Sequence, residues 1–100
     1  MRIIWSPLAL SRVSEAANYI AADNPSAAEK WVVDIFASVE RISKQPRLGR
    51  MVPEVNREDI RELIFGAYRI IYRVESARIF VLTVRHGRRL LEVSEALGER

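Results

Sequence analysis

The residues of this chain that could do chemistry are arginines, tyrosines and one histidine, and most of them lie in its second half. Seven arginines fall between Ile60 and Leu91 against two glutamates, which gives this segment a charge of 7 − 2 = +5. The planar, forked guanidinium group binds carboxylates and phosphates through paired hydrogen bonds. The pattern therefore indicates an anionic partner, although a solvated basic surface with no specific partner would have the same composition.

Other kinds of site are excluded by composition. The chain has no cysteine, so it forms no disulfide and no cysteine zinc site, and its single histidine cannot supply a multi-histidine metal site. No glycine-rich phosphate loop and no nucleophile elbow is present. We expect no metal and no cofactor, so any catalysis would depend on the arginines, the tyrosines and His86.

Three strands are predicted to carry these side chains, near residues 60–65, 68–75 and 78–85. The short links at 66–67 and 75–77 predict two hairpins. Side chains alternate along a strand, so Arg69 and Arg73 share one face while Tyr68 and Tyr72 share the other. The third strand is apolar on both faces, which predicts an interior position in the sheet.

The first half of the chain predicts one strand and two helices. Residues 2–5 read as a strand, and Ser6 followed by Pro7 is typical of a helix start. A helical apolar stripe then runs to Ile20, and Asn24-Pro25 ends that helix and begins a second, expected over residues 25–45. Residues 46–59 show neither the helical nor the strand repeat of apolar residues and are predicted to be a loop.

The predicted fold class is α+β, one domain over residues 1–100 in the order β-α-α-β-β-β. An antiparallel helical hairpin should pack on one face of a mainly antiparallel four-stranded sheet. We expect the helices to cover Tyr68, Ile70, Tyr72, Phe80, Leu82 and Val84. The opposite face should stay open to a partner, with Leu63, Ile71 and Val81 ringed by Arg61, Arg69, Arg73 and Arg85.

Targeting signals are not apparent. The N-terminal residues leave no room for a signal-peptide apolar region, and no apolar run approaches the roughly 20 residues that a membrane span needs. We expect a cytoplasmic protein with no membrane partner.

Several short motifs, in order along nearly the whole chain, resemble one family of proteins. They are Ile-Ile-Trp at 3–5, Asn24-Pro25, Arg-Glu-Leu at 61–63, Tyr-Arg-Ile-Ile-Tyr-Arg-Val at 68–74 and His-Gly-Arg-Arg at 86–89. Together they resemble the RelE/ParE superfamily of type II toxin–antitoxin toxins, and the ParE branch most.

The resemblance implies a non-enzymatic toxin that inhibits DNA gyrase by binding, arrests growth and serves plasmid or chromosomal stability. A ParD-like antitoxin would neutralise it in a hetero-oligomer. The residues expected to bind antitoxin or target are Arg61, Leu63, Arg69, Ile71, Arg73, Val81, Arg85, Arg88, Arg89, Leu90 and Leu91.

Two alternatives remain open. The RelE branch of the same superfamily implies a ribosome-dependent mRNA endoribonuclease, with His86, Arg85 and Arg61 at the site. Nuclease members often carry a tyrosine or another proton-moving group near the C-terminus, and this chain has none after His86. A small nucleic-acid-binding module would show steeply salt-dependent binding. The modest net charge of +3 and the lack of an evident exposed aromatic residue disfavour it.

Overall fold

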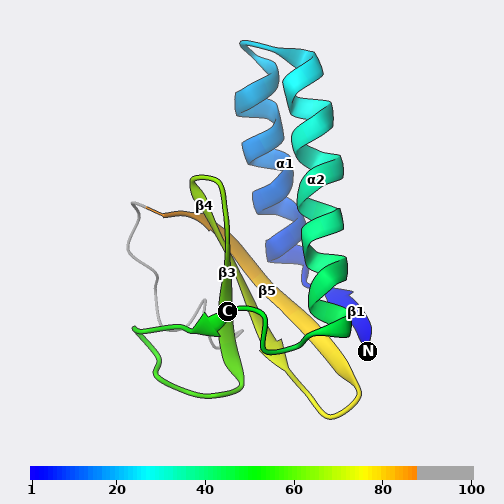
Figure 1. Cartoon of the computed structure of the whole chain (residues 1–100). Helices are drawn as coiled ribbons and strands as arrows, with labels where there is room; N and C mark the ends of the chain where they lie inside the picture. Colours follow the sequence, from blue (N-terminus) through cyan, green and yellow to red (C-terminus); the bar gives the residue numbers. More distant parts are fainter. Residues whose placement is uncertain (88–100) are drawn as a thin grey trace.

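The structure, a computed structural model, describes residues 1–87. Its elements are β1 (Arg2–Trp5), α1 (Pro7–Ala21), α2 (Pro25–Lys44), β2 (Arg50–Met51), β3 (Ile60–Phe65), β4 (Tyr68–Val74) and β5 (Arg78–His86). The strand order in the sheet is β1-β5-β4-β3-β2, in which β1 runs parallel to β5 and the other neighbours are antiparallel. The helical hairpin rises from one side of this sheet (Figure 1).

The α+β fold and the predicted element order are confirmed, but the sheet has five strands rather than four. The additional strand is β2, inside the segment that was predicted to be a loop. Its two residues pair with Glu62 and Arg61 of β3. Two residues are too few to show the alternation of a strand, so only the pairing with β3 reveals β2.

Side-chain caps begin both helices where the sequence predicts. The Ser6 hydroxyl accepts the Ala9 N–H at 2.9 Å, and the Asn24 Oδ1 accepts the Ala27 N–H at 3.1 Å. Ser6 also donates its hydroxyl proton to the Leu82 carbonyl at 2.8 Å, which ties the start of α1 to β5. Across residues 1–87, neither helix is long and apolar enough to pass through a membrane.

The main core lies between the hairpin and the sheet. Val13 of α1 and Ile35 and Val39 of α2 pack with Ile70, Val81 and Val84 of the sheet. Further along, Ile42 packs with Tyr72 and Ile79. Tyr68, Ile70, Tyr72 and Val84 therefore face the helices as predicted.

A β-bulge in β5 corrects the predicted face of three residues. Ile71 pairs with Thr83 and Tyr72 with Val81, which leaves Leu82 as an extra residue with no partner. The alternation shifts by one at this point. Val81 therefore faces the helices, and Phe80 and Leu82 lie on the opposite face.

Leu63 was also assigned to the wrong face. It pairs with Ile70 in the antiparallel ladder, and paired residues share a face. Leu63 accordingly packs against the helical core. Strand register, which a single sequence does not fix, decides this placement.

The opposite face of the sheet is covered rather than open. Val52 and Ile60 are fully buried there against Ile71 and Leu82, with Val55 and Phe80 packed at the margin. The chain from residue 52 to residue 60 thus forms a strap over this face. The expected open apolar surface does not exist.

Tyr72 anchors the chain as it leaves α2. Its buried hydroxyl donates to the Pro46 carbonyl at 2.8 Å and accepts the Gly49 N–H at 2.8 Å. Burial is the main cause that raises the pKa of this hydroxyl.

We expect Tyr72→Phe to lower the free energy of unfolding by about 1–3 kcal/mol, because two buried polar groups of the chain lose their partner. Urea denaturation at pH 7 measures the change. Tyr19→Phe is the matched control, since Tyr19 is 81% exposed and its loss of a hydroxyl should change stability by less than about 0.5 kcal/mol. Equal stabilities of the Tyr72→Phe variant and the wild type would contradict this role.

Candidate functional site

The arginines predicted to form a basic landing surface are largely engaged within the molecule. Arg69 is 8% exposed, and its Nε donates to Glu62 at 2.6 Å while its two Nη atoms donate to both oxygens of Glu54 at 2.8 and 2.9 Å. The second oxygen of Glu62 accepts from the Arg50 Nε at 2.6 Å. We call Arg50, Glu54, Glu62 and Arg69 the Glu62 network.

Arg61 and Arg73 are engaged as well. Arg61 is 9% exposed and donates to the carbonyls of Gly49 at 2.9 Å and Glu58 at 3.0 Å. Arg73 donates to Glu75 at 2.8 Å, and its guanidinium carbon lies 5.3 Å from the centre of the Phe80 ring. The prediction of an open basic face was wrong, because nearby carboxylates and backbone carbonyls accept the hydrogen bonds of these guanidinium groups.

Apart from Arg85, which is described with the cleft below, the remaining predicted binding residues divide into two groups. Ile71 is fully buried under the strap, and Leu63 and Val81 face the helices. Arg88, Arg89, Leu90 and Leu91 lie outside the described residues. Their proposed part in binding stays a prediction.

The ion pairs shift the pKa values of their acids. The hydrogen bond from Arg69 is the main cause that holds the pKa of Glu54 below its ordinary value. Arg78, followed by Arg73, does the same to the pKa of Glu75. The two acids in turn raise the pKa of Arg69, the Glu54 hydrogen bond contributing most.

Replacing Glu62 with glutamine should be costly, because the amide keeps only one of the two acceptor oxygens and places an N–H donor against the other guanidinium group. We expect Glu62→Gln to destabilise the fold by about 3 kcal/mol or more. The control is Glu58→Gln, which removes only an exposed 3.6 Å pair with Arg47 and should change stability by less than about 0.5 kcal/mol. Chemical denaturation of both variants provides the comparison, and similar effects would contradict a structural role for the Glu62 network.

The pKa of Glu54 predicts how stability depends on pH. A folded-state pKa below the unfolded one means that the ion pair stabilises the fold above the unfolded pKa and that this contribution is lost as the pH falls. We expect Glu54→Gln to be less stable than the wild type at pH 7, with the difference shrinking once the pH falls below about 4.5, the ordinary value for this carboxyl. Denaturation midpoints at a series of pH values test this, and a constant difference down to pH 3 would contradict it.

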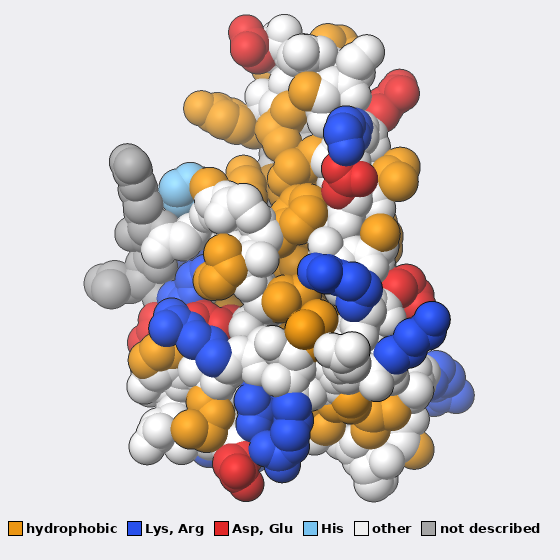
Figure 2. All heavy atoms as spheres, in the orientation of Figure 1, with side chains coloured by type: hydrophobic (Ala, Val, Ile, Leu, Met, Phe, Trp, Pro, Cys, Tyr) orange, Lys and Arg blue, Asp and Glu red, His pale blue; other side chains and the backbone are white. Residues whose placement is uncertain are grey.

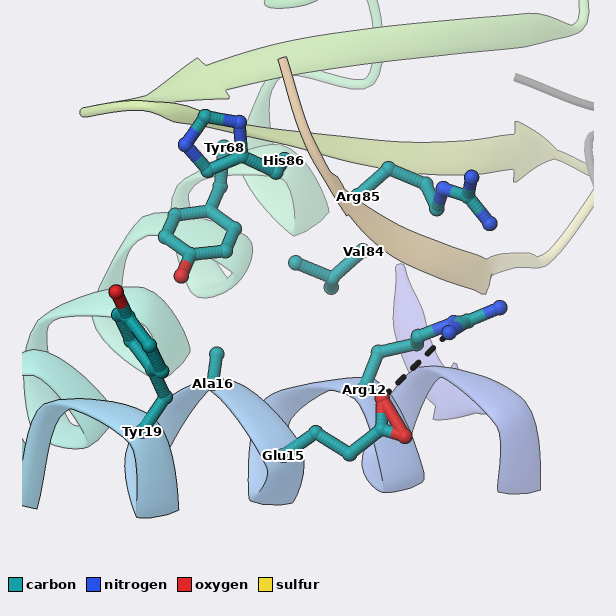
Figure 3. A pocket seen from close by; sticks show the side chains of 8 residues that line it. All are labelled: Arg12, Glu15, Ala16, Tyr19, Tyr68, Val84, Arg85 and His86. Atoms are coloured by element: carbon teal, nitrogen blue, oxygen red, sulfur yellow. Dashed lines mark hydrogen bonds and ion pairs between the residues drawn. The ribbon is translucent and has the colours of Figure 1, made fainter. Parts of the chain in front are cut away.

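A cleft between α1 and the end of β5 is the best candidate site among the described residues. It has a volume of about 500 Å³. Its walls come from α1, β4 and β5 (Figure 3). The residues that line this α1–β5 cleft are Arg12, Glu15, Ala16, Tyr19, Tyr68, Val84, Arg85 and His86.

Aromatic packing positions His86 in the cleft. Its ring meets that of Tyr68 edge-on, with centroids 5.4 Å apart, and Tyr68 is backed by Trp31 at 5.2 Å. The side chain of Tyr19 stands across the cleft from Tyr68 (Figure 3). At 81% exposure, Tyr19 is the exposed aromatic residue that the sequence did not reveal.

Charge in the cleft comes from both walls. Arg12 of α1 lies 3.5 Å from Glu15, and Arg85 extends from β5. Two guanidinium groups, an imidazole and two phenols can hold an anionic group, and the imidazole and phenols could also move protons. Within residues 1–87, no cluster of three or more His, Cys, Asp or Glu side chains could hold a metal ion.

The structure brings two of the three predicted nuclease residues together and separates the third. His86 and Arg85 both line the cleft, whereas Arg61 pairs with Tyr72, four residues along β4 from the partner of His86. At 3.3 Å per residue this separation is roughly 13 Å. The residues that line the cleft together with His86 and Arg85 include Arg12 and Tyr19 instead of Arg61. Their spacing of seven residues, off the apolar stripe of the helix, was the signal in the sequence.

Comparisons with known proteins agree with this fold. The family described as the ParE toxin of the type II toxin–antitoxin system parDE matches residues 3–91. Putative toxin Y4kP of Sinorhizobium fredii is 35% identical over 88 residues, covering 86% of this chain and 88% of that protein. Toxin RelE2 of Caulobacter vibrioides is 24% identical over 89 residues, covering 89% and 98%.

A solved structure shares the fold. The chromosomal ParDE toxin–antitoxin system from P. aeruginosa contains a chain that superposes with a TM-score of 0.71 at 21% identity, covering 86% of this chain and 95% of that one. The helical hairpin, the sheet and the sequence matches define a toxin of the RelE/ParE superfamily. Within it, the chain belongs to the ParE toxin family of type II toxin–antitoxin systems.

Proposed function

We propose that this toxin inhibits DNA gyrase by binding to it and that a ParD-like antitoxin neutralises it in a hetero-oligomer. The family match over residues 3–91 is the observation that carries this proposal. The cytoplasm, where gyrase acts, is the expected location, and growth arrest and the maintenance of a plasmid or chromosomal segment are the expected consequences.

The α1–β5 cleft is the surface that we assign to the target. Tyrosine and arginine are the residues most often found at the energetic centre of protein interfaces, and the cleft has two of each. Tyr19 stands exposed at its rim, about two turns along α1 from Arg12 and on the same side of the helix. A partner that inserts a carboxylate between Arg12 and Arg85 and packs an apolar side chain on Tyr19 would use all of these groups.

A second candidate function is cleavage of mRNA. The observation that favours it is the position of His86 beside Tyr68 and across from Tyr19, with arginines on both walls. In such a site His86 or a tyrosine would move the proton of the 2′-hydroxyl, and Arg12 and Arg85 would stabilise the phosphate. Arg61 would have no part in it.

Purified protein should block gyrase supercoiling at stoichiometric excess, and Tyr19→Ala should weaken the block by tenfold or more, as expected for a contact at the centre of an interface. Val33→Ala is the matched control. Val33 is 67% exposed on α2 and does not line the cleft, so this variant should inhibit like the wild type.

Primer extension on mRNA from induced cells separates the two candidates. Unimpaired supercoiling together with codon-positioned cuts that disappear in His86→Ala would overturn gyrase inhibition and support cleavage. DNA breaks without such cuts would support gyrase as the target.

A further inference from the structure

Strand β3 is the edge of the sheet over half of its length. Its neighbour β2 pairs only with Arg61 and Glu62, so among residues 1–87 no strand lies beside Leu63–Phe65. The chain leaves the edge at Gly49, where an added Cβ would lie 2.4 Å from the Glu62 carbonyl oxygen. One residue earlier, the Leu48 N–H is used in a turn, by the Gln45 carbonyl at 2.9 Å.

The backbone of Ile64 points outward from this edge. The Asp59 carbonyl accepts from Val74 at the end of β4, whereas the Ile60 carbonyl accepts from Val52 on the other side. In an antiparallel sheet the N–H and C=O of one residue point to the same side and alternate along the strand. The backbone N–H and C=O groups of Ile60, Glu62 and Ile64 therefore point away from β4. The N–H and C=O of Ile64 are a donor and an acceptor in position for another strand.

Apolar side chains gather around the same edge. Ile64 is 57% exposed, and Leu48 and Met51 are each 38% exposed. On the helix side, Leu63 and Phe65 are half-buried, and the Trp31 ring lies 5.9 Å from that of Phe65. Figure 2 shows apolar side chains along the hairpin and the adjoining part of the sheet, with Lys and Arg side chains beside them.

Basic side chains flank the edge. The side chains of Arg47 and Arg50 are 69% and 67% exposed, and both lie on the short segment that ends beside Glu62. Each has one acidic partner, and a guanidinium group has five N–H donors, so each can also bind an incoming carboxylate. The charge favours an acidic partner.

We propose that the edge of β3 at Leu63–Phe65 receives an extended segment of the antitoxin as an additional strand. The main chain of that segment would pair with Ile64, and its apolar residues at alternate positions would pack on Leu63 and Phe65. Carboxylates flanking them would meet Arg47 and Arg50. The inference rests on the antitoxin of the proposed function but does not depend on gyrase as the target.

Hydrogen exchange of the Ile64 amide tests the proposal directly. The probe is the full-length ParD-like antitoxin of the proposed function, which we expect to be encoded beside the toxin gene, added to saturation. We expect exchange at Ile64 to slow at least tenfold, while the amides of β1, at the other edge of the sheet, are unchanged.

Proline at this position separates the backbone contact from the side chain. The Ile64 N–H is not part of the β3–β4 ladder, so Ile64→Pro spares that ladder and removes the outward donor together with the isoleucine side chain, and proline is tolerated at a sheet edge. We expect Ile64→Pro to weaken antitoxin binding tenfold or more and to weaken it more than Ile64→Ala, which keeps the donor. Val33→Ala should bind normally. If Ile64→Pro does not fold, the exchange of the wild-type Ile64 amide and the affinity of Ile64→Ala decide the matter.

Each other outcome has a clear meaning. Tight binding of the antitoxin with unchanged exchange at Ile64 would overturn the proposal. So would slowing of this amide with toxin concentration alone, because the occupant would then be a second copy of the chain. A wild type that inhibits gyrase but binds no antitoxin would overturn this inference and leave the target intact, whereas protection of Ile64 without gyrase inhibition would do the reverse.

Discussion

The carboxylate of Glu62 is buried, and a buried charge is tolerated only when its hydrogen bonds are satisfied. Here the two oxygens take Arg69 of the neighbouring strand and Arg50 of β2. Arg69 also donates to Glu54, so the hydrogen bonds that satisfy Glu62 continue to a residue of the strap over the sheet. The network thus ties β2 and the strap to β3 and β4, next to the apolar cluster that buries Ile71. Of the two surfaces that we propose for function, the α1–β5 cleft lies outside the network, and the edge of β3 shares only Arg50 with it.

Local chemistry made much of the fold predictable. Ser6-Pro7 and Asn24-Pro25 marked both helix starts, and the alternation in residues 68–74 marked a strand with one apolar face. What the sequence did not show depends on pairing between distant segments. The extra residue Leu82, the register of Leu63 and the two residues of β2 are visible only when strands lie side by side. The same limit applied to Arg69, whose partner Glu54 comes from a segment with no period.

The candidate site was predicted in part. His86 and Arg85 both line the cleft, although neighbours along a strand point to opposite faces of the sheet. Arg61 does not join them, because its partner in the ladder is Tyr72 rather than Tyr68. Arg12 and Tyr19 come from the first helix, and only the packing of that helix on β5 brings them to the site. The likeness to a ParDE chain at 21% identity shows the fold, so the character of the cleft has to be argued from this chain's own side chains.

The single unpaired residue in β5 also determines which way the last strand presents its C-terminal end. From Val81 onward, an uninterrupted alternation would turn Thr83 and Arg85 toward the helices and turn Val84 and His86 away from them. The insertion of Leu82 reverses this phase, so that Val84 joins the helical core and His86 meets Tyr68. The same residues in a strand with regular alternation throughout would carry the imidazole on the side of the sheet where the strap lies. The side chains available beside α1 therefore depend on this one irregularity in strand pairing as well as on the types of residue in β5.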